Sequence, residues 1–383
     1  MKLIFTSFLL AFLFTQYPNY KPFEEIILYE NGTGDYACYR IPAVVKAPDG
    51  TLLSFIEGRK NNCSDYGNVD LLVRRSTDNG LHWSPPDLVV DYGDLQAGNP
   101  APVVDYTDPK FPEGRIFLFY NTGNASEHDI RMGKGIREVW YKTSTDQGKN
   151  WSEGVNITSL VHFNKNSKFP TKDWRTHACT PGHAIQLTRG KHKGRLYIAA
   201  NHSQGEPQEG FNEYRACGFY SDDHGKTWAV SPDVPIPSSN EAIGVELPNG
   251  NLMLNIREQN GKSKTRLIAI SKDGGQSWSQ TYFDPNLISP VCQSSILLFE
   301  NNDSSFLVYS GPNSTSKREK MTLKFSFDMG ASWTFEKEIF SGASAYSDLV
   351  QIDKKTLGLF FEKENKNTFL KIDLGWIDHP KIQ

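Results

Sequence analysis

The stretch Ser76-Thr-Asp-Asn-Gly-Leu-His-Trp83 decides the fold, because its pattern Ser-x-Asp-x-Gly-x-x-Trp recurs along the chain. Within each copy, the Asp carboxylate can accept backbone N–H groups, the glycine can adopt a positive φ and the tryptophan can pack beneath the turn. The repeat therefore predicts a hairpin turn that the chain uses several times. Five complete copies occur at spacings of 50 to 77 residues: Ser76–Trp83, Ser144–Trp151, Ser221–Trp228, Ser271–Trp278 and Ser326–Trp333.

Runs typical of β-strands lie between the repeats and are bounded by turns, for example residues 115–120, 195–200, 251–256 and 305–309. Helical periodicity is not sustained, and no low-complexity linker divides the chain. One antiparallel unit cannot bury both of its faces, so radial packing of four-stranded sheets around an axis is favoured. We predict an all-β fold, a six-bladed β-propeller that forms a single domain over residues 17–383. Residues near 340 to 380 and an N-terminal strand would build the sixth blade.

The composition fits this fold and excludes several functional classes. Aromatic residues make up 12% of the 383 residues, with 31 Gly and 21 Pro, a mixture typical of short strands joined by tight turns. Charged residues at 22% and hydrophobic residues at 38% argue against disorder. The 41 Lys and Arg against 44 Asp and Glu give a net charge of −3, so nucleic acid is not an expected partner.

The first residues indicate secretion. Residues 3–14 form an apolar run after Lys2 that has the length of a signal-peptide core and is too short to span a bilayer. We expect residues 1–16 to be a signal peptide; a buried N-terminal element is the alternative, since no small-residue cleavage site is present. No later run approaches the ~20 apolar residues of a membrane span. The predicted location is secreted or lumenal, in an extracellular, periplasmic or lysosome-like compartment.

The cysteines and glycosylation sequons are compatible with that location. An oxidising compartment would permit two disulfides among Cys38, Cys63, Cys179, Cys217 and Cys292, and one hypothesis pairs Cys38 with Cys63. No Cys-x-x-Cys or His/Cys pair has zinc spacing, so no metal site is expected. Eight Asn-x-Ser/Thr sequons occur, a number that chance in an Asn-rich chain could also produce: Asn31, Asn62, Asn124, Asn150, Asn156, Asn201, Asn302 and Asn313.

Four segments outside the repeats hold arginines and a tyrosine in distinctive contexts: Tyr39-Arg-Ile-Pro42, Asn255-Ile-Arg257, Ser316-Lys-Arg318 and Ala345-Tyr-Ser-Asp-Leu349. With these segments, the chain from about residue 24 to 376 resembles the exo-α-sialidases, six-bladed propellers whose repeats are known as Asp-boxes or BNR repeats. Asp-boxes also occur in other propellers. The arginine and tyrosine segments therefore carry the functional part of the resemblance.

The resemblance implies a clamp for an acidic sugar. Arg40, Arg257 and Arg318 match the three arginines of the family. Arginine forms bidentate, charge-assisted hydrogen bonds with carboxylates, and sialic acid carries a carboxylate on its anomeric carbon. Glu362 in Phe360-Phe-Glu362 matches the carboxylate that orients the first arginine. This partner is physically sensible, because an unpaired cluster of arginines would repel itself.

The resemblance also implies catalytic roles. Tyr346 matches the nucleophile, a neutral phenol that avoids the repulsion a carboxylate would meet at a negatively charged carbon. Glu241 matches the base that activates this phenol. Asp65 matches the acid/base, and burial by substrate is expected to raise its pKa. The implied outcome is retention through a covalent tyrosyl-sialosyl intermediate, with no cofactor.

Other contacts with the sugar are less defined. Glu57 and Arg59 resemble the pair near the C4 substituent, while Asn99 stands where many relatives have Asp, which puts that contact in doubt. His183 and His202 are expected to be turn or wall residues, because the implied mechanism leaves them no proton to move.

The sequence thus predicts an exo-α-sialidase that hydrolyses terminal α-ketosidically linked sialic acid on glycoproteins, glycolipids or oligosaccharides. A trans-sialidase would use the same residues and differ only in its acceptor site. A non-catalytic sialoside-binding propeller would keep the arginines and lose Tyr346, Glu241 or Asp65, all of which are present.

Overall fold

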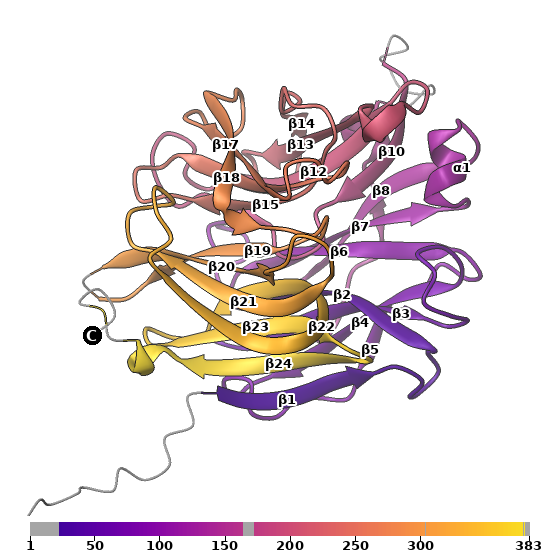
Figure 1. Ribbon diagram of the computed structural model, residues 1–383. Coiled ribbons are helices and arrows are strands. Elements are labelled where there is room, and N and C mark those ends of the chain that lie inside the picture. Colours follow the sequence, from indigo (N-terminus) through magenta and orange to yellow (C-terminus); the bar gives the residue numbers. More distant parts are fainter. Residues whose placement is uncertain (1–22, 164–171, 303, 378, 380–383) are drawn as a thin grey trace, which may run out of the picture.

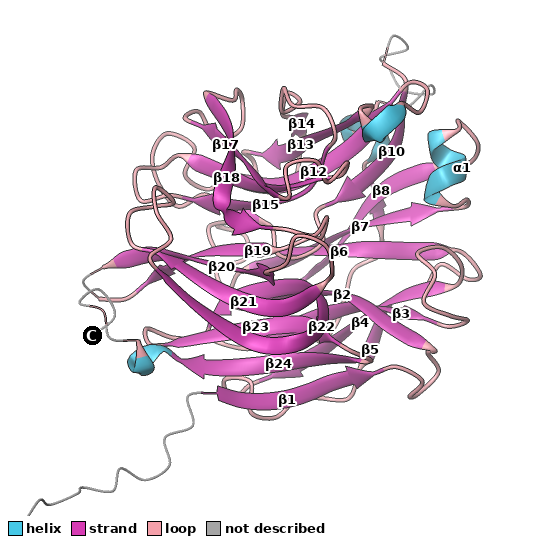
Figure 2. Cartoon of the chain, in the orientation of Figure 1, coloured by secondary structure: helices cyan, strands magenta, loops and turns pink. Residues whose placement is uncertain are grey.

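The computed structural model describes residues 23–163, 172–302, 304–377 and 379, and strands make up nearly all of its regular structure (Figures 1 and 2). The expected all-β class is confirmed. The expected signal peptide at residues 1–16 lies outside the described residues. None of the helices in the described ranges is long and apolar enough to cross a membrane. These helices are α1 (Glu127–Arg131), α2 (Thr158–Val161) and the 3₁₀ turns η1 (Glu209–Phe211) and η2 (Leu374–Trp376).

The strands follow one another as antiparallel meanders. The first contains β2 (Cys38–Lys46), β3 (Leu52–Arg59), β4 (Val69–Ser76) and β5 (Asp87–Val90). The second contains β6 (Gln96–Asp105), β7 (Arg115–Gly123), β8 (Arg137–Ser144) and β9 (Val155–Asn156). The third contains β10 (Trp174–Cys179), β11 (Ile185–Gln186), β12 (Leu196–Gln204), β13 (Tyr214–Ser221) and β14 (Ala229–Val230).

The second half of the chain repeats this arrangement. The fourth meander contains β15 (Ser239–Glu246), β16 (Leu252–Glu258), β17 (Thr265–Ser271) and β18 (Gln280–Ile288). The next contains β19 (Ser295–Glu300), β20 (Ser305–Pro312), β21 (Glu319–Ser326) and the first part of β22 (Phe335–Gln351). The last contains the second part of β22, β23 (Thr356–Lys363), β24 (Lys366–Asp373) and the N-terminal β1 (Phe23–Glu30). As predicted, an N-terminal strand completes the C-terminal meander, and Figure 1 shows the indigo β1 beside the yellow β24.

Hydrogen bonds join these meanders into sheets of seven, five, four and eight strands within the described residues. The seven-stranded sheet unites two meanders because β22 pairs with β21 along one part and with β23 along the other. The eight-stranded sheet unites two through a single parallel contact between Val69 and Gln96. The hydrogen-bonded sheets by themselves therefore do not separate six blades.

The hydrophobic core lies between neighbouring meanders. Phe119 of β7 packs edge-on against Phe219 of β13, with ring centroids 5.5 Å apart. Val44 of β2 and Phe360 of β23 share another cluster, which joins the first meander to the last. A sheet in this molecule thus buries its faces only against its neighbours.

Each Ser-x-Asp-x-Gly-x-x-Trp repeat forms the turn that follows the third long strand of its meander. In the second repeat, Asp146 Oδ1 accepts the Ser144 hydroxyl and the N–H of Asn150, each at 2.9 Å. Gly148, with φ of +76°, donates its N–H to Ser144 Oγ at 2.9 Å. The same three bonds recur in the other four repeats. The predicted roles of the Asp and Gly are confirmed.

The glycine and the tryptophan of a repeat also reach the preceding meander. A Cβ on Gly148 would lie 2.2 Å from Leu53 Cδ2. Trp151 packs edge-on against Phe55, with ring centroids 5.8 Å apart. Leu53 and Phe55 both lie on β3, so the second repeat rests on the first meander. The repeats therefore join neighbouring meanders, which the local pattern alone does not indicate.

We expect Asp146→Ala to lower the free energy of unfolding by about 1–2 kcal/mol, because the Ser144 hydroxyl and the Asn150 N–H lose their acceptor. Urea denaturation measures this loss. Glu153→Ala removes the same charge from a nearby exposed position and serves as the control. Equal denaturation midpoints for the two variants would contradict the role assigned to Asp146.

Three histidines are buried between the second and third meanders. His162, His177 and His202 are each at most 2% exposed. Burial lowers the pKa of His162 to about 3 and lowers the pKa values of His177 and His202 as well. All three imidazoles are therefore neutral near pH 7.

This burial predicts acid sensitivity. Below about pH 6.5 the unfolded chain binds protons on these histidines that the folded chain excludes, so the free energy of unfolding should fall as the pH decreases. The slope is at most about 1.4 kcal/mol per pH unit for each histidine. His162→Phe loses no hydrogen bond from a ring nitrogen among the described residues and should flatten the slope between pH 6.5 and 4. The control is His128→Gln at an exposed site; identical slopes for the two variants would refute the prediction.

Candidate active site

A polar cavity collects side chains from several meanders. Its lining includes seven of the predicted site residues: Glu57, Arg59, Asp65, Asn99, Glu241, Arg257 and Tyr346. Three others, Arg40, Arg318 and Glu362, lie against one of the lining residues, Tyr346. The structure therefore brings all ten predicted residues together, although they span more than three hundred positions of the chain.

Similar irregularities in strand pairing occur beside several of these residues. In the strand that begins a meander, two residues face a single residue of the next strand, which is the arrangement of a β-bulge. Such bulges occur at residues 41–42 of β2, 99–100 of β6, 240–241 of β15 and 345–346 of β22. Because a bulge redirects the side chains beside it, Glu241 and Tyr346 reach the cavity by the same device.

The Tyr346 hydroxyl lies at the centre of a charged network. It donates to Glu241 Oε1 at 2.5 Å, and Arg257 Nη1 lies 3.1 Å from its oxygen. Arg257 Nη1 also donates to Glu241 Oε2 at 2.7 Å. Burial and the Glu241 carboxylate raise the pKa of Tyr346 above its ordinary value, an effect that the nearby arginines only partly offset. The phenol is therefore neutral at physiological pH, with its proton directed at a carboxylate.

Two further guanidinium groups lie against the Tyr346 ring. The Cζ atoms of Arg40 and Arg318 are 5.1 Å and 5.7 Å from its centroid. Glu362 accepts two hydrogen bonds from Arg40, at 3.1 Å and 3.2 Å, and so fixes its orientation. Arg318 donates to the carbonyl of Val291 at 2.9 Å and forms no ion pair with a carboxylate in the described part of the chain. Arg318 is thus available to an anionic ligand.

Asp65 stands at the mouth of the cavity with 77% of its side chain exposed. Its Oδ1 lies 2.8 Å from Arg59 Nη1 and 3.4 Å from Arg40 Nη1. Burial by surrounding residues acts to raise the pKa of Asp65, but Arg59 and Arg40 outweigh it, and the pKa is lowered. Asp65 is therefore ionised in the free protein, and the expected rise of its pKa concerns the substrate-bound state alone.

Glu57, Arg59 and Asn99 form one buried network. Arg59 is paired with Glu57 Oε2, and the shortest distance between nitrogen and oxygen is 2.6 Å. Glu57 Oε1 accepts the N–H of Asn99 at 2.8 Å. Asn99 enters this network through its backbone, where a positive φ of 55° turns the chain toward Glu57.

The residues that form a second wall of the cavity were not predicted from the sequence. Glu127 of α1 accepts the Tyr214 hydroxyl at 2.6 Å and a hydrogen bond from Arg137 at 2.9 Å. The short helix begins with Ser126, whose hydroxyl accepts the N–H of Asp129 at 3.1 Å, and the Ser-x-x-Asp pattern could have indicated it. Ile41 lies in the Tyr39-Arg-Ile-Pro42 segment, and no local signal in the sequence analysis marks the other lining residues: Gln96, Ala178, Asn201, Asn240 and Gln259.

A disulfide between Cys38 and Cys63 ties the start of β2 to the loop that carries Asp65. Arg59 also donates to the carbonyl of Cys63 at 2.7 Å. The hypothesised pairing is present. The second disulfide that the composition allowed is not formed, since the other three cysteines are free and buried.

Asp348 anchors the strand that carries Tyr346. Its carboxylate accepts the N–H groups of Val44 and His183 at 2.8 Å and 2.9 Å and the Ser295 hydroxyl at 2.9 Å. These donors belong to β2, the segment before β11, and β19, so one buried carboxylate joins four parts of the chain. His183 is a partner in this anchor, as expected of a structural residue.

Comparison with known proteins assigns the chain to a family. Residues 50–359 match the family described as BNR repeat-like domain. The chain belongs to this family. A sialidase of Micromonospora viridifaciens is 30% identical over 367 residues, which cover 91% of this chain and 53% of the relative. A sialidase of Bacteroides fragilis is 30% identical over 363 residues, which cover 86% of this chain and 61% of the relative.

This BNR repeat-like chain thus spans 53% and 61% of the lengths of these two relatives. The solved structure of the Hadza microbial sialidase Hz136 superposes with a TM-score of 0.75 at 26% identity, covering 90% of this chain and 67% of that one. The resemblance to sialidases stated from the sequence is confirmed.

Removal of the disulfide should destabilise this BNR repeat-like chain. Replacing both Cys38 and Cys63 by Ser should lower the free energy of unfolding by about 2–4 kcal/mol, because the unfolded chain gains conformational freedom. The loop with Asp65 should also exchange its amide hydrogens faster. Dithiothreitol should reproduce both effects on the unchanged chain and add nothing to the double variant. If the reductant alters neither, the disulfide does not hold this loop.

Proposed function

We propose that this chain is an exo-α-sialidase that hydrolyses terminal α-linked sialic acid from glycoproteins, glycolipids or oligosaccharides. One observation carries the proposal: three arginines surround a tyrosine whose hydroxyl is bonded to a glutamate. Guanidinium groups bind carboxylates with good geometry, and sialic acid carries its carboxylate on the carbon that reacts. Arg318, without a carboxylate partner among the described residues, supplies the positive charge that the substrate would neutralise.

Tyr346 is the proposed nucleophile and Glu241 its base. As the phenol oxygen bonds to the anomeric carbon, the phenol proton passes to Glu241 and the bond from that carbon to the aglycone oxygen breaks. The hydrogen bond of 2.5 Å provides the path for this proton. Arg257, whose Nη1 lies 3.1 Å from the hydroxyl, would stabilise the negative charge that develops on the phenol oxygen.

Asp65 is the proposed acid for the departing oxygen. Bound substrate would place a carboxylate near Arg40, weaken the positive field at Asp65 and exclude water from its exposed side chain. Both changes raise the pKa of a carboxyl group and favour its protonated form. In the second half of the reaction, water would attack the anomeric carbon and give a proton to Asp65. The bond from that carbon to the Tyr346 oxygen would break and Glu241 would return its proton to that oxygen, so the configuration is retained.

For the fold, the proposal is a single six-bladed propeller over residues 17–383. Six hydrophobic clusters support it, since each lies between two consecutive meanders and one joins the last meander to the first. Radial packing leaves only short, protected sheet edges, and the starting strands of the meanders can converge on one cavity at the centre.

Residues 1–16 remain a proposed signal peptide, and the proposed location is secreted or lumenal. Exposed sequon asparagines at Asn124, Asn150 and Asn156 could accept glycans in such a compartment, whereas a glycan on Asn62 would obstruct the cavity. Asn201 is 2% exposed and lines the cavity, so the folded chain cannot present it for glycosylation.

The test is release of the fluorophore from a synthetic α-sialoside between pH 4 and 7. The unchanged chain should turn the sialoside over, and Tyr346→Phe should lower kcat by at least about a thousandfold, because the nucleophile is lost. Tyr309→Phe is the matched control, since its buried hydroxyl has no hydrogen-bond partner among the described residues. Near-normal turnover by Tyr346→Phe would refute the assignment of the nucleophile.

Two further outcomes separate hydrolysis from the alternatives. Binding of the sialoside by the unchanged chain without any turnover would indicate a sialoside-binding protein. Formation of sialyllactose after addition of lactose would indicate transfer to a sugar in place of hydrolysis. If the chain is a hydrolase, free sialic acid should be the product both with and without added lactose.

A further inference from the structure

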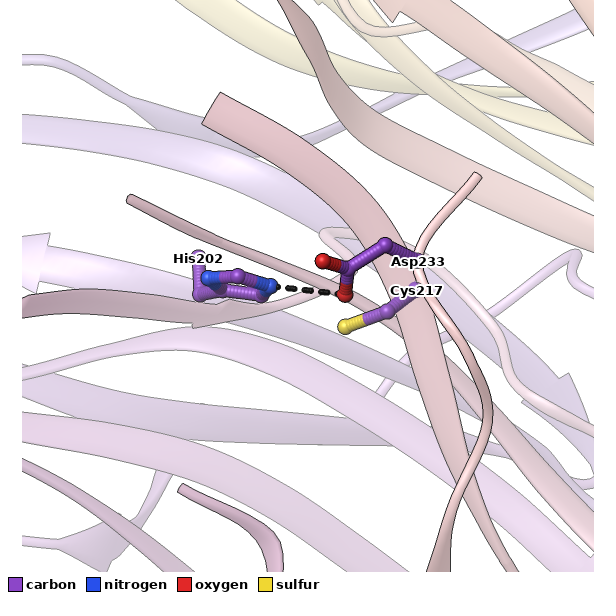
Figure 3. A group of neighbouring side chains, drawn as sticks. All are labelled: His202, Cys217 and Asp233. Atoms are coloured by element: carbon purple, nitrogen blue, oxygen red, sulfur yellow. Dashed lines mark hydrogen bonds and ion pairs between the residues drawn. The ribbon is translucent and has the colours of Figure 1, made fainter. Parts of the chain in front are cut away.

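Three side chains with metal-binding groups meet at a place separate from the cavity. They are His202 of β12, Cys217 of β13 and Asp233 of the segment between β14 and β15 (Figure 3). One imidazole nitrogen, the thiol sulfur and one carboxylate oxygen all lie within 4.8 Å of one another. None of the three residues lines the cavity described above.

The sheet itself places the first two groups. In the antiparallel register, His202 faces Arg215 and Cys217 faces Ala200, so His202 and Cys217 are diagonal neighbours on adjacent strands. Backbone hydrogen bonds on either side of Asp233 hold its segment against β13. Ser231 donates its N–H to the carbonyl of Gly218, and Val234 donates to the carbonyl of Ala216, each at 2.8 Å. The carboxylate is therefore fixed above the thiol by regular backbone hydrogen bonds.

The three groups are prearranged for a ligand that interacts with all of them. His202 Nε2 lies 2.9 Å from Asp233 Oδ1, and Figure 3 shows the Cys217 thiol directed at the same pair. The Trp174 ring stacks on His202 with centroids 3.4 Å apart and an angle of 11°, which fixes the plane of the imidazole. The thiol is free of any disulfide. A metal ligand held in one orientation by its surroundings binds more tightly.

The chemistry of the three groups selects the ion. Imidazole nitrogen, thiolate sulfur and carboxylate oxygen are the ligands of zinc, whereas calcium and magnesium take oxygen ligands. Zinc–ligand bonds of ~2.0–2.3 Å bring the ligand atoms to roughly 3.5 Å from one another, so side-chain shifts of about 1 Å would close the site. A divalent cation would also balance the charges of a thiolate and a carboxylate in a largely buried position.

A pocket adjoins the cluster at Asp233. Asp233, Trp174 and Ser231 line a pocket beside the cluster, and 35% of the Asp233 side chain is exposed. This pocket offers an approach for the ion and room for a water molecule as fourth ligand, the pattern of zinc sites with three protein ligands.

A second group of potential metal ligands already has a positively charged partner. Asp105, Asp108 and His224 also lie close together, but Arg115 Nη2 is 2.9 Å from Asp108 and 3.9 Å from Asp105. A guanidinium thus already supplies the positive charge there. The cluster on β12 and β13 is therefore the better candidate for a metal ion.

We propose that His202, Cys217 and Asp233 bind a zinc ion, which takes the place of the proton shared by His202 and Asp233. Such an ion would fasten the segment after β14 to the sheet. The proposal does not depend on the proposed sialidase activity, since none of these residues belongs to the catalytic cavity.

The test uses the full chain, freed of metal with EDTA and titrated with Co²⁺ as the spectroscopic probe. A cobalt–thiolate absorption band that saturates at one ion per chain, and that Zn²⁺ abolishes by displacement, is the expected result. Cys217→Ser should remove this band, and Asp233→Asn should weaken Co²⁺ binding at least ~10-fold while keeping the partner of His202. Cys179→Ser alters another buried free thiol of the same sheet and should leave the band intact.

Two results would overturn the proposal. One is the absence of a saturable band from the unchanged chain when its circular dichroism shows it folded. The other is a band that survives in folded Cys217→Ser or in folded Asp233→Asn with unchanged affinity. If Cys217→Ser does not fold, the Asp233→Asn titration decides alone, because its substitution lies at a partly exposed position.

Discussion

The carboxylate of Glu241 joins the two groups on which the proposed chemistry depends. One oxygen accepts the Tyr346 hydroxyl and the other accepts a hydrogen bond from Arg257. Removing one partner of a buried ion pair leaves an uncompensated charge, which costs several kcal/mol, so the three side chains hold one another in place. The same constraint couples Arg40 to Glu362 and Arg59 to Glu57. The cavity is consequently charged and ordered before any substrate arrives, which is the condition for electrostatic catalysis.

The scaffold and the site use different structural devices. The repeated Ser-x-Asp-x-Gly-x-x-Trp turns fasten one meander to the next, as Gly148 and Trp151 do against β3. The bulges in the starting strands then turn Glu241 and Tyr346 out of the regular ladder and into the shared cavity. Asp65 alone stands on an exposed loop, where a disulfide limits its movement. The proposed nucleophile and its proposed base are thus fixed by strands, whereas the proposed acid is exposed to solvent in the free protein.

One strand serves both sites described here. Asn201 of β12 lines the polar cavity, and the next residue, His202, belongs to the cluster with Cys217 and Asp233. Successive side chains of a strand point to opposite faces, so neighbouring residues can serve separate sites. A zinc ion at His202 would therefore stabilise the sheet behind the cavity without entering it.

The sequence by itself determined what depends on short patterns. Five repeats specified their own turns, and the motifs around Arg40, Arg257, Arg318 and Tyr346 indicated an acidic sugar as ligand, because these signals lie within a few neighbouring residues. Only the tertiary structure decided the bulge that displays Glu241, the wall built by Glu127, Arg137 and Tyr214, and the meeting of His202, Cys217 and Asp233. Each of these depends on strand register or on the approach of distant segments, and the packing of one sheet against the next sets both.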